Sequence, residues 1–298
     1  MADRVPPSFS VSLPAGGCRA ALRCLLAGLW VLTLGGCSGL LFYPQSRLVQ
    51  TPSELGLEYR DVWLESADGV RLHGWWLPAR AEPVLGTVYF LHGNAENIST
   101  HVYNMRWLPD EGYQVFLLDY RGFGRSAGNP ALPAVFEDIR TGFAHLLDNP
   151  ASRGKPLFLL GQSLGASLGL YFAATDGQAR RELDAVVSDA AFASYRGIAR
   201  TVAARSWLTW LFQWPVAWSL PSQYDPVDYV GAIAPTPLLL IHSRDDPIIP
   251  FENALRLYRA AHPPVTLRTT RGPHTATFGD PEQRRFLLAF FSDRTQAH

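Results

Sequence analysis

Gly161-Gln162-Ser163-Leu164-Gly165 stands between an apolar run at residues 156–160 and a longer apolar stretch at residues 166–174. The first run has the length of a buried strand, and the second has the length of a helix. A Gly-x-Ser-x-Gly segment at such a junction forms a turn so tight that the serine adopts strained backbone, and side chains in place of the glycines would collide with neighbouring elements. This context, more than the pentapeptide itself, makes Ser163 the candidate nucleophile.

The composition favours one large domain without a polyanionic partner. The chain has 298 residues, enough to bury a sizeable core, and no charge run or low-complexity linker divides it. Its 26 basic and 26 acidic residues give a formal net charge of zero, so no nucleic-acid partner is expected. Lys155, the sole lysine, lies at the opposite end of the predicted strand from Ser163, which argues against a serine–lysine mechanism.

Residues 1–36 are typical of a signal peptide. Arg19 and Arg23 precede an apolar stretch, residues 24–34, that is too short to cross a bilayer comfortably but suits the core of an export signal. The mature protein is therefore expected outside the cytoplasm.

Leu34-Gly35-Gly36-Cys37 resembles a bacterial lipobox, whose cysteine is diacylated and becomes the new N-terminus. The resemblance implies lipidation of Cys37, a tether over residues 37–55 and attachment to a membrane of the bacterial cell envelope. Ser38, where an aspartate would retain the protein at the inner membrane, implies the periplasmic side of the outer membrane. Residues 40–44 are apolar enough to lie on a membrane or to pack against the domain. An ordinary signal peptide or a short membrane anchor, with Cys37 incidental, is the alternative.

The three cysteines, Cys18, Cys24 and Cys37, all precede the domain expected over residues 56–298. No disulfide can therefore form inside that domain, despite the oxidising compartment that export implies. Its stability has to come from the apolar core.

Hydrophobic patterning predicts an open, mostly parallel sheet of about eight strands with helices on both faces. Residues 57–65 and 70–77 flank an Asp-Gly turn and predict an antiparallel hairpin at the edge of the sheet. Short apolar runs predict parallel strands at residues 87–91, 114–118, 156–160, 185–188, 237–241 and 265–269. Helical patterns lie between these runs, at residues 98–109, 134–147, 164–174, 252–261 and 281–291. Active-site residues should lie on loops beyond the C-terminal ends of the strands.

Three segments resemble the α/β-hydrolase superfamily. His92-Gly93-Asn94-Ala95, the Asp-Tyr-Arg-Gly-Phe-Gly-Arg-Ser run at residues 119–126 and the turn at residues 161–165 match its anchored serine-hydrolase branch, which includes lipid-linked bacterial hydrolases and protein-depalmitoylating enzymes. The resemblance covers nearly the whole mature chain. It implies an α/β-hydrolase fold with a short helical lid inserted at residues 190–225, and chemistry that needs no metal or organic cofactor. Ser243 is a departure, because the family usually has glycine at that position.

A serine hydroxyl becomes a good nucleophile only when a base takes its proton, and an imidazole base needs a carboxylate to hold its tautomer. In this fold the chain order is serine, acid, histidine. His274 follows the last predicted strand directly, where the fold delivers its histidine, so it is the candidate base. His242 precedes its own acid candidates, His262 ends a helix and His298 lies on the terminal tail. The alternative for His274 is a solvated loop histidine.

The candidate acid lies in residues 241–250, which carry Asp245 and Asp246 directly after a predicted strand. Successive side chains leaving a strand point in opposite directions, so only one of the two can face the histidine. The resemblance favours Asp246, because the acid of the family stands four residues before a proline, and it leaves Asp245 for a turn or a salt bridge. Asp189, after the preceding strand, is the alternative acid, since some members place it there.

An oxyanion hole needs fixed N–H donors at the point where charge appears in the transition state. The backbone N–H of Leu164, at the start of the predicted helix, is the first candidate, and the helix dipole adds to its effect. The loop after residues 87–91 should supply the second donor, with Asn94 as the candidate. His92 precedes the serine in the chain and is expected to support this loop by hydrogen bonding.

Four tryptophans recur at three- and four-residue spacing, which predicts a helical stripe: Trp207, Trp210, Trp214 and Trp218. The stripe falls in the expected lid, and Pro215 should bend or restart the helix, so two short helices are expected. One interpretation is packing of the lid onto the domain. The other is an apolar wall for an acyl chain, or a patch that seeks the lipid interface.

The combined prediction is a lipid-anchored serine hydrolase that cleaves carboxylic esters or thioesters of a small or lipid-like acyl substrate through an acyl-enzyme on Ser163. A serine peptidase would use the same residues. A non-catalytic lipoprotein could keep the fold as a binding scaffold, although an intact set of serine, acid and histidine argues against it.

Overall fold

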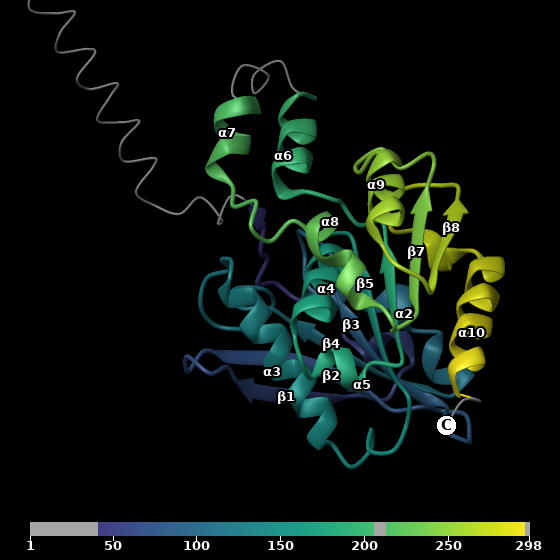
Figure 1. Ribbon diagram of the computed structural model, residues 1–298. Coiled ribbons are helices and arrows are strands. Elements are labelled where there is room, and N and C mark those ends of the chain that lie inside the picture. The colour runs from purple at the N-terminus through teal and green to yellow at the C-terminus, as the bar shows by residue number, and fades with distance from the viewer. Residues whose placement is uncertain (1–40, 206–212, 296–298) are drawn as a thin grey trace, which may run out of the picture. The chain divides into compact units, whose positions relative to one another are not determined.

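In the computed structural model, which describes residues 41–205 and 213–295, eight strands form one sheet in the order β1-β2-β4-β3-β5-β6-β7-β8 (Figure 1). The strands are β1 Arg60–Glu65, β2 Arg71–Leu77, β3 Gly86–Leu91, β4 Tyr113–Asp119, β5 Leu157–Gln162, β6 Ala185–Asp189, β7 Leu238–Ser243 and β8 Val265–Thr270. β2 runs antiparallel to β1 and β4, and the other neighbouring pairs are parallel. The predicted fold class is confirmed, and the predicted hairpin and parallel strands are all present.

The chain divides into two units, Met1–Cys37 and Ser38–His298, and the described residues all belong to the second. The predicted signal peptide and Cys37 therefore lie outside the described residues, as do Trp207 and Trp210. Within the described part of the chain, no helix combines the length and the apolar character needed to cross a membrane.

Helices cover both faces of the sheet because successive residues of each strand point to opposite sides. The helices are α2 Ile98–Met105, α3 Ala134–Asp148, α4 Leu164–Thr175, α5 Ala179–Glu182, α6 Tyr195–Ala203, α7 Gln213–Ser219, α8 Pro226–Tyr229, α9 Glu252–Ala260 and α10 Pro281–Thr295, with 3₁₀ turns η2 Pro52–Leu55, η3 Leu108–Glu111, η5 Val230–Ile233 and η6 Thr277–Gly279. In β4, Leu117 packs into the core shared with α2 and α10, whereas Leu118 packs into the core shared with α3 and α4. The residues of β4 thus contribute to two cores, one on each face of the sheet.

The helix predicted at residues 98–109 is shorter than expected. α2 ends at Met105, and Pro109 lies in the separate turn η3. Proline has no N–H to donate to the carbonyl four residues earlier, so the helical hydrogen bonds stop before it.

The segment predicted as a lid contains two short described helices, α6 and α7, which lie side by side (Figure 1). Pro215 lies in the first turn of α7, where a missing N–H costs nothing. Asp225, after α7, is bound to the start of α6. Its carboxylate accepts hydrogen bonds from the Ser194 hydroxyl and the Tyr195 N–H, both at 2.8 Å. Two short helices are therefore described in this segment, but Pro215 lies within α7 and not between the two helices.

Candidate active site

Ser163 occupies the turn between β5 and α4 with φ 55° and ψ −117°, a backbone conformation that non-glycine residues rarely adopt. The flanking glycines make the turn possible. A Cβ atom at Gly161 would lie 2.4 Å from the carbonyl oxygen of Gly165, and one at Gly165 would lie 2.1 Å from that of Leu91. The steric reason inferred from the sequence for both glycines therefore holds in the structure.

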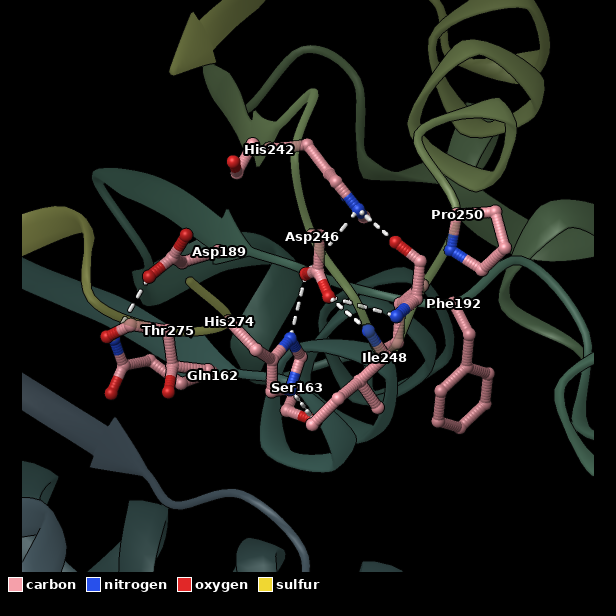
Figure 2. A network of polar contacts seen from close by, with 12 residues as sticks. Gln162, Ser163, Asp189, Phe192, His242, Asp246, Ile248, Pro250, His274 and Thr275 are labelled. Atoms are coloured by element: carbon pink, nitrogen blue, oxygen red, sulfur yellow. Dashed lines mark hydrogen bonds and ion pairs between the residues drawn. The ribbon is translucent and has the colours of Figure 1, made fainter. Parts of the chain in front are cut away.

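His274, on the loop after β8, lies between Ser163 and Asp246 (Figure 2). Its Nε2 is 2.8 Å from the Ser163 Oγ, and its Nδ1 is 2.7 Å from Asp246 Oδ2. Because the carboxylate accepts the Nδ1 proton, Nε2 is left as the acceptor for the serine hydroxyl. These three residues, predicted from different parts of the chain, form one continuous hydrogen-bonded series.

Asp246 is held by backbone as well as by histidine. Its Oδ1 accepts hydrogen bonds from the N–H groups of Ile248 at 2.7 Å and Ile249 at 2.9 Å. Burial by itself would raise the pKa of Asp246, but the bonds from His274 and these two amides outweigh it and hold the pKa below the usual value. The side chain therefore stays ionised at neutral pH and faces His274 with a full charge.

Asp245, the neighbouring aspartate, pairs with Arg271 and not with His274. It is exposed and lies 3.3 Å from the guanidinium of Arg271, as expected for a salt-bridge residue. Ser243 stands where the family that this chain resembles usually has glycine. Its hydroxyl donates to the carbonyl of Gly272 at 2.7 Å and accepts from the Asp245 N–H at 3.1 Å. The departure from the family pattern thus ties the acid loop to the histidine loop.

Asp189, the alternative acid, makes its hydrogen bonds elsewhere. Its carboxylate accepts from the Gln162 side-chain amide and from the Thr277 hydroxyl, both at 2.8 Å. Complete burial raises the pKa of Asp189 to about 6. The structure therefore brings Asp246, and not Asp189, into contact with the candidate base.

A second polar network, missed by the sequence analysis, supports the histidine loop. The Asn104 side-chain amide donates to Gln162 Oε1 at 2.7 Å, and Gln162 in turn donates to the carbonyl of Thr275 at 3.3 Å. Thr275 follows His274 and has a φ of 56°. In the sequence, only Gln162 could have indicated this network, because a polar residue at the end of a buried strand needs hydrogen-bond partners. Nothing in the sequence marked Asn104 or Thr277.

The loop after β3 approaches the serine closely. A Cβ atom at Gly93 would lie 3.4 Å from the Ser163 Cβ and 3.5 Å from the carbonyl oxygen of Gln162. Leu164 is the first residue of α4, so its N–H has no intrahelical acceptor. Both predicted oxyanion donors, the N–H groups of Asn94 and Leu164, are therefore carried by segments that meet at Ser163.

His92 supports this loop from the buried side. Its Nδ1 donates to the carbonyl of Gly93 at 2.8 Å, and its ring stacks on Tyr120 with 4.3 Å between centroids. Burial, with a smaller contribution from neighbouring His101, lowers the pKa of His92 to about 3. A neutral, packed imidazole agrees with the supporting role expected for it.

The described lid tryptophans are not part of the core. Trp214 is 49% exposed and Trp218 is 68% exposed, with 6.1 Å between their ring centroids. The guanidinium of Arg200 lies over the Trp214 ring, 4.7 Å from its centroid. About half or more of each side chain is therefore exposed to solvent.

Two surface cavities of the described chain, of about 360 and 390 Å³, do not include the serine site. The first lies against β1 and the end of α3, and the second lies between α3 and α4. Among the described residues, no group of three or more His, Cys, Asp or Glu side chains is arranged to hold a metal ion.

The strand order and the strained serine turn at the end of β5 define an α/β-hydrolase. The chain belongs to the family described as serine aminopeptidase S33, whose model matches residues 82–231. The YfhR protein of Escherichia coli O157:H7 is 33% identical over 80% of each chain. Lysophosphatidylserine lipase ABHD12 of Xenopus tropicalis is 26% identical over 86% of this chain and 75% of its own length. Among solved structures, the Pyrococcus furiosus esterase Pf2001 superposes with a TM-score of 0.68 at 26% identity, covering 85% of this chain and 97% of that one.

Proposed function

We propose that this protein is a serine hydrolase that cleaves carboxylic ester or thioester bonds through an acyl-enzyme on Ser163. The observation that carries the proposal is the series Ser163 Oγ–His274 Nε2 at 2.8 Å and His274 Nδ1–Asp246 Oδ2 at 2.7 Å. The similarity to an archaeal esterase and to a lysophosphatidylserine lipase supports ester substrates over other acyl compounds.

In the proposed reaction, the Ser163 Oγ attacks the acyl carbonyl carbon while His274 Nε2 accepts the hydroxyl proton. The carbonyl oxygen becomes negatively charged and receives hydrogen bonds from the N–H groups of Leu164 and Asn94. Collapse of this intermediate breaks the bond to the alcohol or thiol, which leaves with the proton from His274. Water then attacks the acyl-enzyme, His274 takes its proton, and the carboxylic acid departs as Ser163 recovers its hydroxyl.

A serine aminopeptidase is the second candidate, and the description of the matching family favours it. The same three residues would act, but the bond broken would be the peptide bond that follows a free N-terminal residue. Hydrolysis of p-nitrophenyl esters of two to sixteen carbons, compared with aminoacyl p-nitroanilides, separates the two activities. Because p-nitrophenyl esters are intrinsically more reactive than anilides, turnover of the anilides is the readout that decides. The ester proposal predicts ester turnover that is lost in Ser163→Ala, with no anilide turnover above the level of Ser163→Ala. Anilide turnover by the wild type that is lost in Ser163→Ala would favour the peptidase.

We also propose that Cys37 is lipidated and holds the protein on the periplasmic face of a bacterial outer membrane. The proposal rests on the lipobox-like sequence before Cys37. A Cys37→Ser variant, expressed with a clickable palmitate analogue, should lose both the label and its sedimentation with outer membranes. Label retained in Cys37→Ser would contradict lipidation at this residue.

A further inference from the structure

Residues 41–49, here called the strap, lie against the loop that carries Asn94. The Asn94 side-chain amide donates to the carbonyl of Leu41 at 2.6 Å, and its Oδ1 accepts from the N–H of Tyr43 at 2.9 Å. Both ends of the Asn94 side chain are therefore bound to strap backbone.

The strap makes further contacts with the start of α2. Asn97 donates from its side-chain amide to the carbonyls of Gln45 at 2.8 Å and Arg47 at 2.9 Å. The N–H of Val49 donates to the Ser99 hydroxyl at 2.8 Å. The strap is thus hydrogen-bonded along residues 94–99, from the candidate oxyanion residue to the first turn of the helix.

A buried phenylalanine fixes the strap to the domain. Phe42 is only 4% exposed, and its ring meets Phe123 edge-on with 6.4 Å between centroids. Phe123 in turn meets the ring of His92 at 5.0 Å. Of the two placements left open for this apolar segment, packing against the domain is the one observed.

The loop under the strap contains two consecutive residues in the left-handed region of backbone conformation. Ala95 and Glu96 are consecutive non-glycine residues with φ of 60° and 65°. Such residues persist where surrounding contacts over-determine them, and they gather at functional sites. Here the surrounding contacts are those of Asn94 and Asn97, whose side chains flank the two strained residues and bind the strap.

We propose that the strap is a positioning segment, which keeps the backbone N–H of Asn94 directed at the developing oxyanion by holding the strained loop in place. The proposal rests on the serine-hydrolase function given above. It adds that the rate of acylation at Ser163 depends on contacts between the loop and a segment that lies some 50 residues earlier in the sequence. The contact between Tyr43 and Asn94 is an example.

The test compares Tyr43→Pro with Tyr43→Ala in the full-length chain. Proline removes the N–H that binds Asn94, whereas alanine keeps it, and the Tyr43 side chain is 63% exposed. Pro44 already restricts residue 43 to extended backbone, which favours tolerance of proline there. Deleting an oxyanion donor lowers kcat by about 10²- to 10³-fold, so a displaced donor should lower kcat by roughly tenfold or more. KM should change by less than about twofold, and fluorophosphonate labelling should slow in parallel with kcat.

Hydrogen exchange of the peptide containing residues 92–99 gives a readout that needs no activity. It should be faster in Tyr43→Pro than in Tyr43→Ala if the strap holds the loop. Should Tyr43→Pro fail to fold, Asn94→Ala removes both strap contacts of that side chain and is measured in its place. Unchanged kcat and unchanged exchange would overturn the proposal. An inactive wild type would instead overturn the hydrolase function, while the exchange comparison would still decide whether the strap positions the loop.

Discussion

Two aspartates near Ser163, whose side chains are shielded from solvent, differ in the partners of their carboxylates. Asp246 binds His274 and two backbone N–H groups, whereas Asp189 binds Gln162 and Thr277. The first set of contacts lies on the proposed path of the proton. The second lies beneath the turn that follows His274.

The two aspartates should respond differently to the same substitution. Asp246→Asn removes the charge that fixes the His274 tautomer, so kcat/KM for an ester should fall by about 10³- to 10⁴-fold. Asp189→Asn acts on the histidine loop from outside the proton path, and its loss should stay within about tenfold. Steady-state kinetics at pH 7.5 measure both values. A larger loss in Asp189→Asn than in Asp246→Asn would reverse the assignment.

Asp189 also makes stability depend on pH. Its pKa is about 6 in the folded protein against 3.8 for the free side chain, so between these values the folded state keeps a proton that the unfolded chain releases. The free energy of unfolding contributed by Asp189 therefore falls as pH rises from about 4 to above 6. At about 1.4 kcal/mol per pKa unit, the full effect is roughly 3 kcal/mol. Urea unfolding at pH 4.5 and 7.5 should show wild type losing stability relative to Asp189→Asn. Asp245→Asn, which removes an exposed carboxylate, is the control, and a difference that does not vary with pH would contradict the argument.

Among the elements, the junction of β5 and α4 has little room for change. A methyl group at Gly165 would meet two backbone carbonyl oxygens, of Leu91 at 2.1 Å and His92 at 2.4 Å, and neither can move without shifting the end of β3. Gly169 lies one turn further along the same helix, where a methyl group would lie 3.3 Å from a side-chain carbon of Leu91.

These two glycines form a matched pair. Gly165→Ala should lower the free energy of unfolding by about 1–3 kcal/mol or more, because backbone cannot yield as a side chain does. Gly169→Ala should be close to neutral, since removing a glycine from a helix interior gains up to about 1 kcal/mol against a modest steric cost. Urea unfolding curves of the two variants provide the comparison. Equal stability of Gly165→Ala and Gly169→Ala would mean that the turn is looser than its geometry indicates.

Helix α7 exposes about half or more of the Trp214 and Trp218 side chains to solvent, so their replacement should affect substrates more than folding. If these rings line the path of an acyl chain, Trp214→Ala together with Trp218→Ala should reduce turnover of a sixteen-carbon ester several-fold more than that of a four-carbon ester. A buried tryptophan typically costs about 3–5 kcal/mol when replaced by alanine, and these exposed rings should cost far less. Equal losses on both esters with a lowered Tm would favour packing.

For the molecule as a whole, the sequence predicted the features that depend on local sequence patterns. Apolar periodicity predicted the strands, and motif context with chain order predicted Ser163, His274 and Asp246 as neighbours. The sequence could not predict the contacts of Asp189 with Gln162 and Thr277, or those of the strap. These contacts join residues that are 27 to 88 positions apart in the chain, and no periodic pattern marks the partners. The tryptophan spacing predicted a helical stripe but could not say which surface the stripe faces.

The central claim is that Ser163 is the nucleophile of a serine hydrolase, and covalent labelling tests it most directly. Full-length protein is treated with a fluorophosphonate probe, and the modified peptide is identified by mass spectrometry beside a known serine hydrolase. Labelling is expected on Ser163 in the wild type, slowed in His274→Ala and absent in Ser163→Ala. A folded wild type that does not label under conditions where the reference enzyme does, or a Ser163→Ala variant that labels as fast as wild type, would contradict it.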